Sequence, residues 1–122
     1  MKKKILIIDD NIDLQSIFRI HFESAGYLVY TSWDWFKWVT DLLDVKPDVI
    51  LLDLMMPNMN GYEVLDTLSN HSSIRVPVIV CSSLSQESDI KKAYELWAAS
   101  YIKKGDISGQ DLVKEVSKFV DL

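Results

Sequence analysis

The sequence predicts an α/β domain built on a doubly wound parallel sheet, and two observations support this prediction. Short, continuously apolar runs recur at residues 5–8, 28–30, 49–52 and 78–81, with a weaker run at 100–102. Continuous apolar character is typical of strands that are buried on both faces. Segments with helical periodicity lie between these runs, and the connections are short. Because parallel neighbours need a crossover helix each time, the alternation predicts parallel strands with helices packed on the sheet.

The first predicted helix follows the run at residues 5–8. Gly26 is the stop signal at its C-terminal end, because glycine readily takes the left-handed conformation that closes many helices. The apolar residues that recur at three- and four-residue steps and predict its buried face are Ile12, Leu14, Ile17, Phe18, Phe22 and Ala25.

Two later helices carry start signals. Asn60 with Glu63 three residues on is typical of a capping box, and Ser108 with Asp111 opens the last helix in a similar way. The apolar residues that follow these caps are Val64, Leu65 and Leu68 in the first helix and Leu112, Val113, Val116, Phe119 and Val120 in the second.

Length and composition exclude several classes of protein. The 122 residues are enough for one domain, expected to span 1–122. Thirteen Lys and Arg against eighteen Asp and Glu give a net charge of −5, which argues against a nucleic-acid partner. A single cysteine, Cys81, forms no internal disulfide. The apolar run at 5–8 is too short for a signal peptide or a membrane span, so a cytoplasmic protein without membrane association is expected.

Charged and hydroxyl side chains follow the predicted strands at the points where they end. Asp9 and Asp10 follow the first strand, Asp53 follows the third, Ser82 the fourth and Lys104 the fifth. Ligands of open parallel sheets bind at this edge, so these side chains are expected to converge. Carboxylates held together repel one another and favour a hard cation, and Mg²⁺ prefers oxygen ligands. The set therefore predicts a Mg²⁺ site with a carboxylate nucleophile for a phosphoryl group, and a hydroxyl that responds to the phosphoryl group's arrival.

Any one of these motifs alone is a weak signal of a protein family, but together and in this order they are a strong one. On them the sequence resembles the receiver domain of two-component response regulators (the CheY-like family), from about Lys4 to the C-terminus. The resemblance implies a five-stranded parallel sheet of order 2-1-3-4-5, a flavodoxin-like fold, flanked by five helices. The matching segments are Ile7-Ile8-Asp9-Asp10-Asn11, the run from Asp53-Leu54-Met55-Met56-Pro57 to Asn60-Gly61-Tyr62-Glu63, Pro77-Val78-Ile79-Val80-Cys81-Ser82-Ser83, Ala98-Ala99-Ser100-Tyr101-Ile102 and Lys104.

The resemblance implies a role for each of these side chains. Asp53 is expected to be the phosphoacceptor, with Lys104 as its partner. Ser82 is expected to be the switch hydroxyl, and Tyr101 the aromatic residue whose position follows it. The Mg²⁺ ligands implied by the family are Asp9, Asp10, Asp53 and the backbone carbonyl of Met55.

The family also implies partners and an output. A histidine kinase or a phosphotransfer protein would phosphorylate Asp53, and a downstream protein target would bind the switched surface. We expect no enzymatic activity beyond slow loss of the phosphoryl group, because Met55 and Leu84 beside the site are apolar and orient no attacking water. A Mg²⁺ phosphohydrolase with an Asp nucleophile is disfavoured, because Asp53-Leu54-Met55 lacks the second carboxylate of the Asp-x-Asp motif of such enzymes.

Three tryptophans depart from the family pattern, because Trp35, Trp38 and Trp97 stand where small residues are usual. Trp35, Trp38 and Leu42 share one helical face, which is typical of core packing. A tryptophan in place of a small residue overfills a core, however, and tryptophan is enriched at binding hot spots. Self-association through Trp35 and Trp38 is therefore the other interpretation. It leads to an alternative function, a non-signalling binding scaffold, natural or engineered, that uses a Trp-rich surface.

Overall fold

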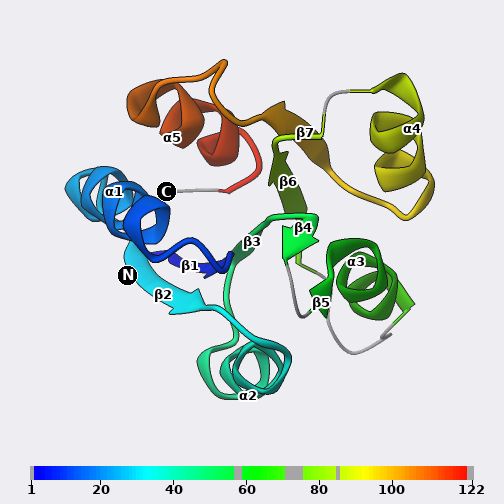
Figure 1. The fold of residues 1–122 in the computed structure, drawn as a ribbon. Helices are drawn as coiled ribbons and strands as arrows, with labels where there is room; N and C mark the ends of the chain where they lie inside the picture. Colours follow the sequence, from blue (N-terminus) through cyan, green and yellow to red (C-terminus); the bar gives the residue numbers. More distant parts are fainter. Residues whose placement is uncertain (1, 57–58, 71–75, 85, 121–122) are drawn as a thin grey trace.

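A parallel sheet of five strands forms the centre of the molecule. The structure, a computed structural model, describes residues 2–56, 59–70, 76–84 and 86–120. The strands of the main sheet are β1 (Lys4–Ile8), β2 (Leu28–Ser32), β3 (Val49–Leu52), β6 (Val78–Ser82) and β7 (Ser100–Lys103). They are parallel throughout and lie in the order β2-β1-β3-β6-β7 (Figure 1). Numbered among themselves, these strands have the order 2-1-3-4-5, so the fold-class prediction is confirmed.

Four helices connect these strands and a fifth follows β7, and side-chain caps form at Ser108 and Asn60, the two residues that the sequence indicated. Ser108 Oγ accepts a hydrogen bond from the Asp111 N–H at 3.1 Å, and Asn60 Oδ1 accepts one from the Tyr62 N–H at 2.9 Å. None of the helices in the described ranges combines the length and apolar character that a bilayer crossing requires. The helices are α1 (Ile12–Ser24), α2 (Trp35–Val45), α3 (Gly61–Asn70), α4 (Glu87–Glu95) and α5 (Gly109–Ser117).

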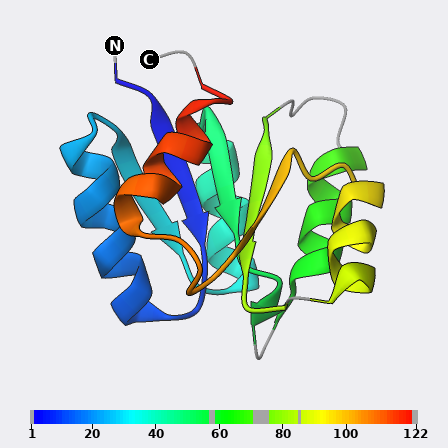
Figure 2. The same cartoon turned by 90° about the horizontal axis from the view of Figure 1, so that it is seen from above.

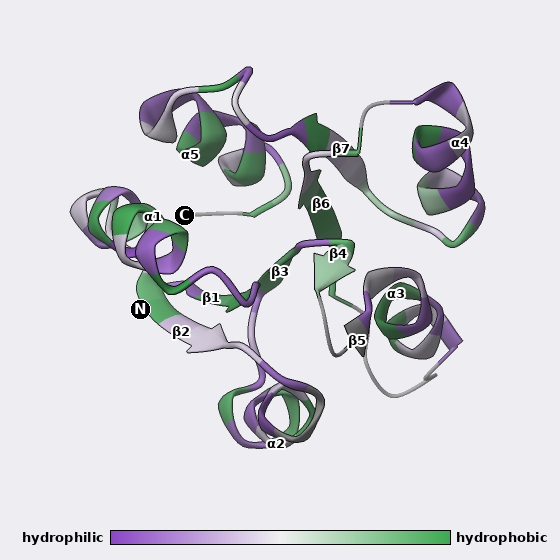
Figure 3. Cartoon of the chain, in the orientation of Figure 1, coloured by the Kyte–Doolittle hydropathy of each residue, from purple (hydrophilic) through white to green (hydrophobic). Residues whose placement is uncertain are grey.

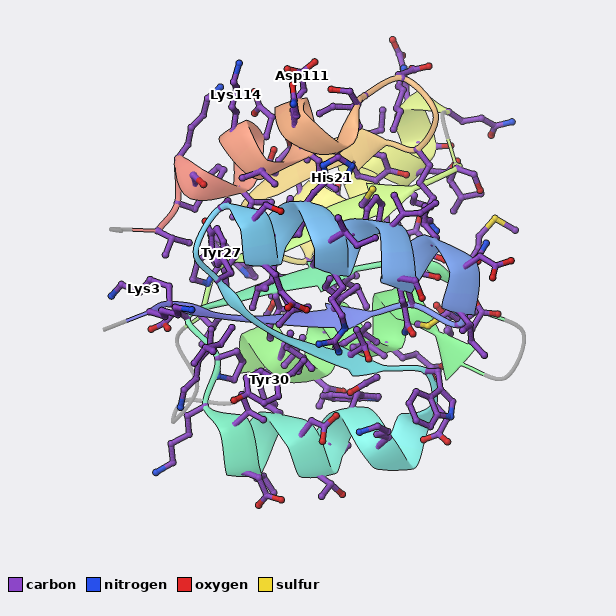
Figure 4. All side chains as sticks on the ribbon, turned by 90° about the vertical axis from the view of Figure 1, so that its left-hand side faces the viewer. Lys3, His21, Tyr27, Tyr30, Asp111 and Lys114 are labelled. Atoms are coloured by element: carbon purple, nitrogen blue, oxygen red, sulfur yellow. The ribbon has the colours of Figure 1, made fainter. Side chains whose placement is uncertain are left out.

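The helices cover both faces of the sheet, and successive strand residues face opposite layers. In β1, Ile5 and Ile7 pack with α1 and α5, whereas Leu6 and Ile8 pack with α2, α3 and α4. Figure 4 looks onto the β2 edge, with α1 and α5 above the sheet and α2 below it. Apolar residues occupy all of β3 and all of β6 except its last residue, Ser82, while each helix carries both kinds of residue (Figure 3). The sheet is thus a rigid platform that fixes where the strand ends lie.

A short antiparallel pair that the sequence did not predict follows β3. It consists of β4 (Met55–Met56) and β5 (Met59–Asn60). Figure 2 shows this pair at the end of the sheet opposite to the segments that enter β1 and leave α5. The pair leads the chain from the carboxyl end of β3 into α3.

The buried face of α1 differs from the one that the apolar pattern predicted. Ile12 and Ile17 are 69% and 50% exposed, and the buried residues of the helix are Gln15, Phe18 and Phe22. The prediction was wrong for the two isoleucines because apolar content does not show which way a helix is rotated. It was also wrong for Ala25, which is the exposed C-cap residue of α1. Phe119 likewise lies beyond the end of α5 and is 40% exposed.

The tryptophans occupy different environments. Trp38 is 1% exposed and packs in the core beneath α2 with Leu42 and Leu6. Core packing is therefore the correct interpretation of Trp38, and self-association through this side chain is excluded by its burial. The side chain of Trp35 lies outside the described part of the structure. Trp97 is 79% exposed.

Trp97 stands at the C-terminal end of α4 in a left-handed conformation, with φ of 71°. The Ala98 N–H donates to the Ala93 carbonyl and the Trp97 N–H to the Tyr94 carbonyl, both at 3.0 Å. This is the hydrogen-bond pattern of a Schellman motif, in which glycine is usual at the left-handed position. A side chain there carries a steric cost of about 1–2 kcal/mol.

We predict that Trp38→Ala lowers the free energy of unfolding by about 3–5 kcal/mol, because it removes a fully buried indole and leaves a cavity. Urea unfolding measures this loss. Trp33→Ala is the control, because Trp33 is 49% exposed, and its effect is expected to stay within about 1 kcal/mol. Equal effects of the two substitutions would contradict the assignment of Trp38 to the core.

We also predict that Trp97→Gly raises the free energy of unfolding by about 1 kcal/mol, because glycine adopts a positive φ without a steric cost. Trp97→Ala is the matched control, since it removes the indole but keeps the β-carbon that causes the strain. Thermal unfolding of both variants measures the difference, and a Trp97→Gly variant no more stable than Trp97→Ala would refute the strain at this position.

Candidate functional site

The predicted site residues meet at the carboxyl edge of the sheet. Asp9 directly follows β1, Asp53 directly follows β3, Ser82 is the last residue of β6, and Lys104 directly follows β7. Because all four strands are parallel, these four positions lie at the same edge of the sheet.

Three carboxylates form the centre of this site. Asp9, Asp10 and Asp53 each offer an oxygen, and these oxygens lie within 4.8 Å of one another. Asp9 and Asp53 are only 3% and 5% exposed, so water offsets their mutual repulsion poorly. Three hard oxygen donors at this spacing fit a divalent cation such as Mg²⁺. The Met55 carbonyl as a further ligand stays a prediction.

The ammonium group of Lys104 joins two of these carboxylates. Its Nζ lies 2.8 Å from Asp9 Oδ2 and 3.1 Å from Asp53 Oδ2. Burial disfavours the charged ammonium, but the hydrogen bond and charge of Asp9, with those of Asp53, raise the pKa of Lys104 above its ordinary value. The pairing with Asp53 was expected, whereas the closer pairing with Asp9 was not.

The surroundings of Asp53 offset the negative charge of its carboxylate only in part. Burial raises the pKa of the Asp53 carboxyl above its ordinary value, and the negative charge of Asp9 raises it further. The charge of Lys104 and a hydrogen bond from the Met55 N–H to Asp53 Oδ1, 3.2 Å long, act in the opposite direction without cancelling the effect of burial. A cation bound among the carboxylates would favour the ionised form of Asp53.

Two glycines shape the loops around the carboxylates. A β-carbon on Gly61 would lie 2.3 Å from Leu54 Cα and 2.6 Å from the Asp53 carbonyl oxygen, so the start of α3 packs directly on the Asp53 backbone. Gly105 follows Lys104 with φ of 88°, in the left-handed region that glycine adopts without a steric cost.

Ser82 and Tyr101 are linked through one segment of the chain. The Ser82 side chain is fully buried, and its Oγ accepts a hydrogen bond from the Leu84 N–H at 3.2 Å. The Tyr101 hydroxyl donates to the Leu84 carbonyl at 2.7 Å. Leu84 therefore connects the hydroxyl at the end of β6 to the half-buried aromatic residue on β7.

Sequence reasoning missed one residue next to the carboxylates, Gln15. It is 6% exposed and donates hydrogen bonds to the Asp9 and Ser32 carbonyls. The available signal was a polar residue three positions before Phe18 and seven before Phe22, which is the spacing of one helical face.

Comparisons with known proteins agree with this geometry. Residues 5–117 match the family model of the response regulator receiver domain. The response regulator SaeR of Staphylococcus aureus is 33% identical over 116 residues, which cover 95% of this chain and 50% of SaeR. The chain spans about half the length of the curated relatives it matches.

Solved structures share the fold. The chemotaxis response regulator CheY4 of Vibrio cholerae matches with a TM-score of 0.89 and 21% identity, covering 98% of this chain and all (100%) of CheY4. The BeF3-activated receiver domain of RstA from Klebsiella pneumoniae matches with a TM-score of 0.85 and 19% identity, over 97% of this chain and 99% of that one. These likenesses show the fold alone.

We predict that Asp53→Asn stabilises the protein in a chelator at pH 7 by on the order of 1 kcal/mol, because it removes a buried charge that its surroundings disfavour. A carboxyl group with a raised pKa contributes stability below its unfolded pKa and loses that contribution as the pH rises through the folded pKa. The advantage of the variant should therefore vanish in acid and grow with pH.

Urea unfolding over a pH series measures this difference. Asp106→Asn is the control, because Asp106 is an exposed carboxylate and its replacement should change stability by less than about 0.5 kcal/mol. Added Mg²⁺ should stabilise the natural sequence more than Asp53→Asn. An Asp53→Asn variant that is less stable at pH 7 would contradict the charge balance described here.

Proposed function

The chain belongs to the response regulator receiver domain family, and we propose that it accepts a phosphoryl group on Asp53 and thereby switches a protein–protein interaction surface. One observation carries this proposal: a buried Asp53 carboxylate lies among two further carboxylates and 3.1 Å from the Lys104 ammonium. The phosphoryl donor would be a histidine kinase or a phosphotransfer protein.

The transfer needs a nucleophile and a way to offset negative charge. An Asp53 carboxylate oxygen forms a bond to the phosphorus of the donor while the bond between that phosphorus and its leaving group breaks. Asp9, Asp10 and Asp53 would hold Mg²⁺, which supplies positive charge next to the transferred group. Lys104 is already within ion-pair distance of Asp53 and supplies a second positive charge.

The response to the phosphoryl group would begin at Ser82. Its Oγ accepts a hydrogen bond from the Leu84 N–H, and a phosphoryl oxygen on Asp53 would offer the Ser82 proton a charged acceptor. A shift of Ser82 towards Asp53 would move the 82–84 segment and loosen the hydrogen bond from Tyr101 to the Leu84 carbonyl. Tyr101 then changes position, and a downstream protein binds the surface formed by α4, β7 and α5.

The scaffold alternative has less support. It depends on a surface formed by tryptophans, and the burial of Trp38 removes one of its two proposed members. Two other tryptophans have described side chains that are exposed, Trp33 and Trp97. Trp33 directly follows β2, whereas Trp97 follows the capping residue of α4, so they belong to different parts of the fold.

We predict that acetyl phosphate with Mg²⁺ adds one phosphoryl group to the natural sequence and none to Asp53→Asn, because an amide at this position has no anionic oxygen to attack the phosphorus, and Asp9 and Asp10 are proposed to hold Mg²⁺. Intact mass spectrometry measures the addition. Asp106→Asn is the control for loss of a carboxylate elsewhere, and a chelator is the control for Mg²⁺. Phosphorylation of Asp53→Asn to the same extent would refute the assignment.

The same experiment times the loss of the phosphoryl group after the donor is removed. We expect slow loss, because the two side chains expected to flank the site, Met55 and Leu84, are apolar and position no water for attack. Loss within seconds would contradict this expectation while leaving the identity of the acceptor intact.

A further inference from the structure

A polar side chain occupies the apolar face of α1. The buried residues of this helix are Gln15, Phe18 and Phe22, and Gln15 is 6% exposed. An amide buried without hydrogen-bond partners is destabilising, because it loses its hydrogen bonds to water and gains none in exchange. An apolar residue would be the default at this position, so the partners of Gln15 indicate what the glutamine does there.

Both partners of Gln15 are backbone carbonyls at the carboxylate site. Its Nε2 donates to the carbonyl of Asp9 and, at 3.1 Å, to the carbonyl of Ser32 at the end of β2. Because both neighbours are acceptors, it is the nitrogen of the amide that faces them. The Asp9 N–H also donates to the Ser32 carbonyl, at 3.0 Å. Gln15 and Ser32 therefore fix the backbone on both sides of the Asp9 α-carbon.

The carboxylate of Asp9 is held as well. Its Oδ1 accepts a hydrogen bond from the Asn11 N–H at 2.9 Å, and its Oδ2 is 2.8 Å from Lys104 Nζ. These two contacts orient the side chain only if the Asp9 backbone stays in place. The Gln15 amide is the side-chain donor that holds the Asp9 carbonyl.

Ser32, whose carbonyl accepts the hydrogen bonds from Gln15 and Asp9, is itself bound to α2. Ser32 is fully buried, and its Oγ donates to Asp41 Oδ2 at 2.6 Å. Lys37 Nζ lies 2.9 Å from the same Asp41 oxygen and 5.1 Å from the centre of the Trp33 ring. The Ser32 carbonyl that Gln15 and Asp9 share is thus part of a strand end that is tied to the neighbouring helix.

We infer that Gln15 is a positioning residue that sets the divalent-cation affinity of the carboxylate site by fixing the backbone of Asp9. This inference rests on the proposed function, in which Asp9 holds Mg²⁺. Mg²⁺ tolerates little deviation from its preferred geometry, so a ligand whose backbone is free to turn binds it more weakly. Groups that orient metal ligands typically change metal affinity by 10–100-fold when they are removed.

The test compares Gln15→Met with Phe18→Leu in the whole chain. Gln15→Met keeps a side chain of similar length but no donor, and Phe18→Leu perturbs the same buried face of α1 one turn further along. Titration calorimetry with Mg²⁺ is expected to show affinity about tenfold lower in Gln15→Met and within about twofold of the natural sequence in Phe18→Leu. Urea unfolding of both variants separates this effect from a general loss of stability.

A second measurement needs no metal. In a chelator, the amide NMR signals of Asp9, Asp10 and Asn11 should shift in Gln15→Met and stay in place in Phe18→Leu. If Gln15→Met does not fold, Gln15→Asn is used, because its shorter amide does not span the two carbonyls. It should weaken Mg²⁺ binding in the same direction.

The outcomes separate the two claims. Mg²⁺ binding by the natural sequence with unchanged affinity in the Gln15 variant would overturn the positioning role and leave the proposed function standing. Equal losses of affinity in Gln15→Met and Phe18→Leu would also overturn it, because the effect would then follow stability alone. No Mg²⁺ binding by the natural sequence would overturn the proposed function, and the role of Gln15 with it.

Discussion

Repulsion between buried carboxylates is the constraint around which this molecule is organised. Asp9 and Asp53 are nearly inaccessible to water, and Asp10 brings a third carboxylate within 4.8 Å. Lys104 offsets part of this charge by pairing with Asp9 and Asp53. One ammonium group does not balance three carboxylates, so the site keeps an excess of negative charge that a bound cation would offset. Because of this excess negative charge, the stability of the fold depends on whether the carboxylates of the site are ionised.

The apolar core on both faces of the sheet stabilises the fold against this repulsion. The two layers on either side of the sheet hold the strand ends in place, and the start of α3 packs so closely on the Asp53 backbone that Gly61 has no room for a β-carbon. Hydrogen bonds complete the support. Gln15 and Ser32 hold the backbone of Asp9, and Leu84 links Ser82 to Tyr101. Under the proposed function, this rigid support would transmit the arrival of a phosphoryl group on Asp53 to the surface of the molecule.

The family resemblance and the departures from it concern different parts of the molecule. The carboxylates, the hydroxyl and the lysine follow the family pattern at the carboxyl edge of the sheet. The tryptophans depart from it, and the two whose side chains the structure describes have local explanations. Trp38 fills the core beneath α2, while Trp97 occupies a left-handed position at the end of α4 where its side chain is exposed. Neither tryptophan belongs to the carboxylate site, so these two departures concern the core beneath α2 and the end of α4 rather than the chemistry of the site.

The sequence by itself determined the sheet and the composition of the site. Continuous apolar runs identify buried parallel strands, and parallel strands bring the residues at their ends to one edge, so Asp9, Asp53, Ser82 and Lys104 were predictable from their order alone. Only the tertiary structure decided how α1 is rotated, which placed Gln15 inside and Ile12 outside, and that Trp38 belongs to the core. It also decided that Lys104 joins two carboxylates. The physical reason is that periodicity describes an isolated element, whereas rotation, burial and pairing depend on neighbours distant in the chain.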